Sequence, residues 1–200
     1  YDVFIERDID FNAHALGNGF VFANIGLLAN CNNEAELAYI LGHEIGHSIF
    51  NHGYMINSDF MSAYNQNNIS QTSKEYVLMF EKSRKAELQS DSFAYECLNK
   101  VQLNLSTIIN SLNILQFSEA SSLFYIDKTR RRSYKDFMNT FGTHPNSTER
   151  KKLLNTFRIN NKITSTNFII DSIYFKKIKK IAHEECKKIS MESGDFENTL

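Results

Sequence analysis

The sequence contains no tryptophan, a single proline and only eight glycines among 200 residues. Proline and glycine are the residues that most often interrupt helices, so long stretches of this chain can remain helical. Hydrophobic residues make up 42% and charged residues 22%, which is typical of a globular domain and not of a disordered or fibrous chain. The scarcity of helix breakers therefore predicts a globular chain in which helix outweighs strand.

Cysteine and long apolar runs are scarce as well. Cys31, Cys97 and Cys186 lie far apart and form no Cys-x-x-Cys pair, so neither a disulfide framework nor a thiolate zinc site is indicated. No run approaches the roughly 18 apolar residues needed to cross a bilayer, and no signal peptide is evident at the N-terminus. We therefore expect no transmembrane segment in this chain.

Charge is distributed unevenly although the net charge is only −1. Acidic side chains outnumber basic ones over residues 1–127, and the reverse holds over residues 128–188. The basic residues are spread over predicted helices, and the only dense cluster is "TRRRS" at 129–133. A solvated face explains this pattern better than a nucleic-acid interface, so no nucleic-acid partner is expected.

Hydrophobic periodicity places strands before helices. "YDVFIERDID" (residues 1–10) and "GNGFVFANIGLL" (17–28) alternate apolar and polar residues, which predicts a small N-terminal sheet. A capping-box pattern at Asn33 begins a predicted amphipathic helix that ends near residue 53. Further helices are predicted over 73–99, 101–126 and 166–191. In the last of these, we expect an inward face made of isoleucines: Ile170, Ile173, Ile178 and Ile181.

The first predicted helix carries two histidines one turn apart. His43 and His47 stand at i and i+4, so both rings project from one face and can reach a single ion, with Glu44 beside it. This is the His-Glu-x-x-His arrangement, in which two imidazoles bind Zn²⁺ and the glutamate acts as a general base. The alternative is a pair of packed or solvated helix histidines. His52 is out of register for the extended motif and is expected to be exposed near the helix C-terminus.

Zinc requires a third protein ligand, and the helix predicted over 73–99 offers one. Glu87 and Asp91 are also spaced i and i+4, on one face of that helix. Glu87 could complete a site with two histidines and one glutamate, and Asp91 could accept the second ring N–H of a ligating histidine. Carboxylates at this spacing are usually solvent-facing, but a helix carrying His-Glu-x-x-His needs such a partner.

Four motifs in order resemble one known family, the gluzincin metallopeptidases similar to HtpX and to the CAAX prenyl endopeptidases. "NAHALGNGFVFANIGLL" resembles the family's Asn-Ala-x-Ala strand followed by an edge strand, and "NEAELAYILGHEIGH" resembles its active helix. "AELQSDSFAYE" is similar to the Glu-x-x-x-Asp zinc helix, and "THPNSTERKKLL" to a Thr-His-Pro element followed by arginine. The resemblance covers most of residues 9–155. Membrane spans known in some members are missing, which indicates a soluble branch.

The resemblance implies an α+β, mainly helical zincin fold in which the edge strand of a small N-terminal sheet flanks the His-Glu-x-x-His helix. It implies one Zn²⁺ per chain held by His43, His47 and Glu87, with Glu44 as general base and acid. It also implies that His144 stabilises the oxyanion or caps the zinc, and that Arg150 holds its loop. An extended peptide is expected to add to the edge strand formed by Gly19, Phe20, Val21, Phe22, Ala23 and Asn24.

The expected function is zinc-dependent endopeptidase cleavage of unfolded or misassembled polypeptides. A chaperone-like or protein-binding module with an idle zinc site is the main alternative, and a hydrolase for a non-peptide substrate is a third. We expect a peptidase domain over residues 1–160 and a helical extension over 161–200 that resembles the start of a helical repeat and could bind a protein partner. The protein is expected to be extracytoplasmic, either periplasmic or anchored to a membrane through a missing N-terminus, with a cytoplasmic location left open.

Overall fold

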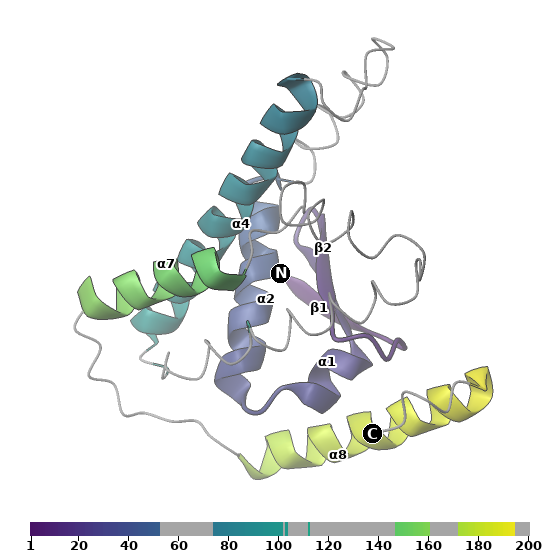
Figure 1. The fold of residues 1–200 in the computed structure, drawn as a ribbon. Coiled ribbons are helices and arrows are strands. Elements are labelled where there is room, and N and C mark those ends of the chain that lie inside the picture. Colours follow the sequence, from purple (N-terminus) through teal and green to yellow (C-terminus); the bar gives the residue numbers. More distant parts are fainter. Residues whose placement is uncertain (53–73, 102, 104–111, 113–146, 161–171, 195–200) are drawn as a thin grey trace.

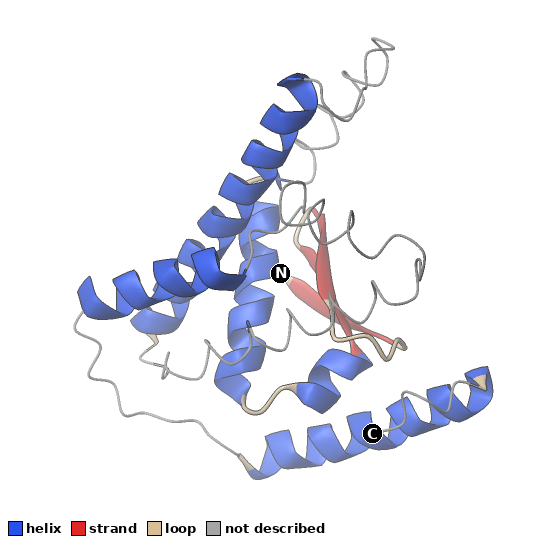
Figure 2. Ribbon diagram, in the orientation of Figure 1, coloured by secondary structure: helices blue, strands red, loops and turns tan. Residues whose placement is uncertain are grey.

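The computed structural model describes residues 1–52, 74–101, 103, 112, 147–160 and 172–194 (Figure 1). Within these residues helix predominates over a small sheet, in agreement with the predicted α+β class (Figure 2). The helix predicted over 101–126 and the basic cluster at 129–133 lie almost wholly outside the described residues. The strands are β1 (Asp2–Glu6), β2 (Ala13–Gly17) and β3 (Phe20–Asn24), and the helices are α1 (Ile25–Asn30), α2 (Glu34–Ile49), α4 (Lys74–Lys100), α7 (Ser147–Asn160) and α8 (Ile173–Ser193).

The sheet has the strand order β1-β3-β2, so β3 lies in its centre. Strand β3 pairs in parallel with β1 and antiparallel with β2. The β2–β3 hairpin turns at Asn18 and Gly19, whose φ angles of 52° and 88° are those that a tight two-residue hairpin demands. The prediction that residues 19–24 form the edge strand is therefore wrong, because both sides of β3 are already hydrogen-bonded within the sheet.

The strand that lies beside helix α2 is β2 (Figure 1). Its Ala13 side chain is buried, and it begins within the "NAHA" segment (residues 12–15), which the sequence placed next to the edge strand. In the described part of the chain, β2 pairs with β3 alone. The edge strand beside α2 is therefore β2, and not β3 as the sequence predicted.

Helix α2 begins as its sequence predicts. The Asn33 side chain accepts a hydrogen bond from the backbone N–H of Glu36, which satisfies one of the free donors at the helix N-terminus. The Glu36 carboxylate accepts from the backbone N–H of Asn32 at 2.8 Å, one residue earlier than the usual capping box. The helix ends at Ile49, earlier than predicted.

Two glycines allow α2 and α4 to approach closely. A Cβ atom on Gly42 would lie 3.3 Å from the Cβ of Ala94, and one on Gly46 would lie 3.1 Å from the Cα of Ser90. Both positions face α4, so their lack of a side chain lets the backbones come together. The close packing of these helices brings the histidine face of α2 opposite the carboxylates of α4.

Helix α8 packs on α1 and begins at a Ser172 cap, whose side chain accepts from the N–H of Phe175. Phe175 and Ala182 are buried, and Phe175 belongs to the same core cluster as residues of α1, α2 and α4. The predicted inward face is wrong, because Ile173 and Ile181 are 72% and 67% exposed. Among the described residues, no helix is long and apolar enough to cross a membrane.

Candidate metal centre

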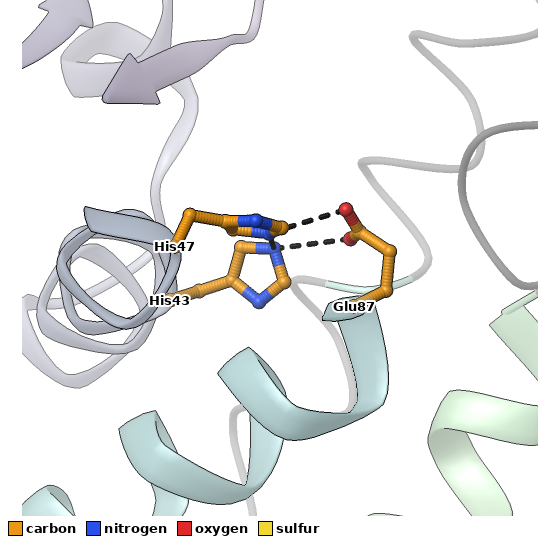
Figure 3. Close-up of side chains that lie close together, drawn as sticks. All are labelled: His43, His47 and Glu87. Atoms are coloured by element: carbon orange, nitrogen blue, oxygen red, sulfur yellow. Dashed lines mark hydrogen bonds and ion pairs between the residues drawn. The ribbon is translucent and has the colours of Figure 1, made fainter. Parts of the chain in front are cut away.

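Three side chains converge where α2 faces α4. The Nε2 atoms of His43 and His47 lie 3.0 Å apart. Each of them lies 3.1 Å from an oxygen of Glu87, which projects from α4 toward both rings (Figure 3). His43 and Glu87 are buried, and His47 is partly buried. The structure therefore brings together the two histidines and the glutamate that the sequence selected as ligands.

The donor set and its spacing fit a zinc ion. The candidate ligand atoms all lie within 4.8 Å of one another. Ligand atoms about 2.0–2.1 Å from a tetrahedral zinc lie roughly 3.3 Å from each other, which is close to the separations of 3.0 and 3.1 Å found here. Two imidazoles and one carboxylate also match the protein ligands of many catalytic zinc sites, which leave one coordination position open.

Behind His43 lies a buried network around Asp91, which is one turn beyond Glu87 on α4. The Asp91 Oδ1 atom lies 2.8 Å from His43 Nδ1 and accepts a 2.6 Å hydrogen bond from the hydroxyl of Tyr39. Arg150 of α7 donates to both carboxylate oxygens, at 2.7 and 2.6 Å. With Nδ1–H directed at Asp91, the neutral His43 ring has its lone pair on Nε2, which faces His47 and Glu87. The network thus fixes the tautomer that a metal ligand requires.

The charges of this network shift the pKa values of its members. Burial acts to lower the pKa of His43, but hydrogen bonds to Asp91 and Glu87 outweigh it and raise that pKa to about 10. Burial acts to raise the pKa of Asp91, but the adjacent Arg150 guanidinium and the His43 ring hold it well below its usual range. Without a metal, His43 is therefore a cation held between two carboxylates.

Three further residues were singled out in the sequence, and two of them lie in the described part of the chain. Glu44 follows His43 on α2 and is partly exposed, so water can reach it. Arg150 belongs to the network of His43, where it donates to both oxygens of Asp91; the loop that it was expected to hold lies outside the described residues. His144 lies outside the described residues.

His52 contradicts its predicted position. It is only 5% exposed, and its ring lies against His47, with Nδ1 atoms 3.2 Å apart. Burial lowers its pKa, so the expected role as an exposed cation at the helix end is wrong. The reason lies in the backbone after α2, where Asn51 takes a φ of 55° and turns the chain back toward the helix.

Tyr39, which donates to Asp91, was not predicted from the sequence. Tyr39 precedes His43 by one helical turn, so its i, i+4 spacing was a usable signal that was not used. Arg150 was singled out only through a family resemblance, and no spacing rule connects it to Asp91 across 59 positions. Gln89 and Ser90 were not predicted as site residues either, and both contact His52.

The amino-acid sequence of the chain is similar to that of known metallopeptidases. Residues 2–157 match the model of peptidase family M48. The chain is also 27% identical over 165 residues to metalloprotease YcaL of Escherichia coli (strain K12). That alignment covers 75% of this chain and 58% of YcaL, so the chain spans little more than half the length of this relative.

Proposed function

Because this chain belongs to peptidase family M48, we propose that it is a zinc-dependent endopeptidase that cleaves unfolded or misassembled polypeptides. The observation that carries the proposal is the convergence of His43, His47 and Glu87 from two helices onto one point. Zinc held there would act as a Lewis acid, polarising a peptide carbonyl and making a water molecule acidic near neutral pH.

The chain's own residues supply the proton transfers. Glu44 takes a proton from the attacking water and later passes it to the nitrogen of the leaving amine, since a carboxylate beside the reacting atoms can serve both steps. Glu44 directly follows His43 on α2, and its partial exposure admits water and substrate. The Asp91–Arg150 pair holds His43 in place during these steps.

Strand β2 supports a peptide substrate. It lies at the sheet edge next to α2, so an extended chain that added to this edge would run past the zinc ligands. Main-chain hydrogen bonds to β2 would orient the scissile bond and make little demand on side chains. Unfolded segments of many sequences fit such a site, whereas most of the backbone N–H and C=O groups of a folded protein are already paired.

The resemblance of "THPNSTERKKLL" to the family's Thr-His-Pro element supports one more assignment. His144 would stabilise the negative charge that develops on the carbonyl oxygen during attack. Removing one such donor from an enzyme of this kind typically lowers kcat by about 10²–10³-fold. We expect His144→Phe to lower kcat while zinc content stays at the wild-type value.

The test is cleavage of an unfolded casein-like protein by the zinc-loaded chain. We expect cleavage that disappears in Glu44→Gln, while metal analysis finds one zinc per chain in both proteins. His183→Ala on α8 is the matched histidine control and should cleave at the wild-type rate. If the zinc-loaded wild type bound the unfolded casein-like protein but did not cleave it, the proposal would be overturned and a protein-binding module would be favoured.

A further inference from the structure

The second ligating histidine, His47, has its own buried partner, separate from the network behind His43. His52 follows the end of α2 and lies with its Nδ1 atom 3.2 Å from Nδ1 of His47, and the two ring centres are 5.0 Å apart. On its other side, His52 Nε2 lies 3.2 Å from the Oε1 atom of Gln89. His47, His52 and Gln89 therefore form a continuous chain of polar contacts from the ligand set to α4.

The backbone after α2 is built to place this ring. Asn51 adopts the left-handed conformation, with φ of 55°, which asparagine tolerates better than most residues. The amide of Phe50 still bonds back to Gly46, and that of Asn51 to Ser48, so the turn is tied to the helix. The Phe50 ring then stacks on His52 at 5.4 Å and contacts Phe93 of α4. His52 is thus held by packing on one face and by hydrogen bonds at its edge.

The hydrogen atoms can be assigned by elimination. The Nε2 atom of His47 faces His43 and Glu87, so a metal ligand at this position must keep its lone pair on Nε2 and its proton on Nδ1. Nδ1–H of His47 then donates to Nδ1 of His52, which leaves the His52 proton on Nε2. That proton is directed at the Gln89 oxygen, which can only accept. The Ser90 hydroxyl, 3.3 Å from Nδ1 of His52, shares the same acceptor as a longer second donor.

We propose that His52 is a positioning residue, which accepts the Nδ1 proton of His47 and so holds that ring in the tautomer and orientation needed to bind the metal. This inference rests on the proposed zinc site. The two ligating histidines are then supported in different ways. His43 is backed by an anion, Asp91, whereas His47 is backed by a neutral ring that is itself oriented by a neutral amide.

The test compares three substitutions that differ in where they leave an acceptor. Asparagine places its Oδ1 close to the position of Nδ1 in histidine, whereas glutamine places its polar atoms close to the position of Nε2. His52→Asn should therefore keep the bond to His47, while His52→Gln and His52→Ala should lose it. Loss of such a partner typically weakens metal binding about 10–100-fold.

Zinc affinity is measured by competition with a chromophoric chelator, on the full chain and without any peptide substrate. We expect a 10- to 100-fold rise in the zinc Kd for His52→Ala and His52→Gln, and a value within about threefold of wild type for His52→Asn. The visible spectrum of the Co²⁺-loaded protein should change in the first two variants and stay as in wild type in the third. His183→Ala should change neither readout.

Three results would overturn the inference. One is an unchanged zinc Kd in His52→Ala. Another is equal weakening in His52→Asn and His52→Gln, because packing and not the hydrogen bond would then be responsible. The third is binding of two zinc ions per wild-type chain with loss of one in His52→Ala, because His52 would then be a ligand.

If His52→Ala does not fold, as judged by far-UV circular dichroism, the comparison of His52→Asn with His52→Gln still decides. Failure of the wild type to cleave casein would count against the proposed function alone. The zinc Kd values are measured without a peptide substrate, so they would still test the role of His52.

Discussion

Replacing Arg150 by methionine should be among the most destabilising single changes at the metal centre. The Arg150 side chain is 5% exposed and makes two charge-assisted hydrogen bonds to Asp91, whose side chain is fully buried. Arg150→Met would leave a buried carboxylate without its guanidinium. Breaking a buried ion pair by removing one partner costs about 3–5 kcal/mol. The hydrogen bonds that Asp91 retains with Tyr39 and His43 place our expectation near the lower end of that range.

The assay is urea unfolding of the metal-free protein near pH 7, followed by far-UV circular dichroism. Lys152→Ala, on the exposed side of the same helix, is the matched control and should stay within about 0.5 kcal/mol of wild type. The double variant Asp91→Asn with Arg150→Met should recover part of the loss, because it removes the buried charge that Arg150→Met leaves uncompensated. A loss below about 1 kcal/mol in Arg150→Met, or no recovery in the double variant, would refute the reasoning.

Three further predictions concern pH, helix packing and thiol reactivity. The metal-free folded state raises the pKa of His43 to about 10, so its contribution to stability is fully present below about pH 6.5 and is lost as the pH rises toward 10. The urea midpoint of the metal-free protein should fall over this range, and an equally steep fall in His43→Asn would contradict the assignment. Gly46→Ala should weaken zinc binding in a chelator competition, because its Cβ would lie 3.1 Å from the α4 backbone and displace Glu87. This effect should appear although alanine has a better helix propensity than glycine. An unchanged zinc affinity would show that α4 can shift without moving Glu87. Burial raises the pKa of the Cys31 thiol to about 12, so Cys31 should react with a disulfide reagent at pH 8 only after unfolding in urea; labelling of Cys31 in the native protein at the rate of a free thiol would argue against its burial.

The three zinc ligands that the sequence predicted follow from local rules. The cap at Asn33 and the i, i+4 spacing of His43 and His47 depend only on helix geometry, so they required no knowledge of the fold. Glu87 was found by the same spacing rule, together with the requirement of zinc for a third ligand. Each of these inferences requires only the geometry of a single helix or the number of ligands that zinc needs.

The errors arise where tertiary packing or backbone geometry decides. The isoleucines of α8 repeat at helical spacing, but α1 accepts the face that carries Phe175 and Ala182 instead. The central position of β3 depends on its parallel pairing with β1, for which alternation along one strand gives no signal. The burial of His52 depends on a single left-handed residue, Asn51, which a helical reading of the segment does not anticipate.

The placement of the ligands on two helices has a consequence for the lifetime of the protein. An ion held by His43 and Glu87 closes a loop between positions 43 and 87, as a covalent cross-link would. Since the unfolded chain has no preformed site, zinc adds RT ln(1 + [Zn]/Kd) to the free energy of unfolding, about 4 kcal/mol at a thousandfold excess over Kd. Zinc scarcity would then remove catalysis and at the same time expose the protein to degradation, so the abundance of the protein would follow the metal supply.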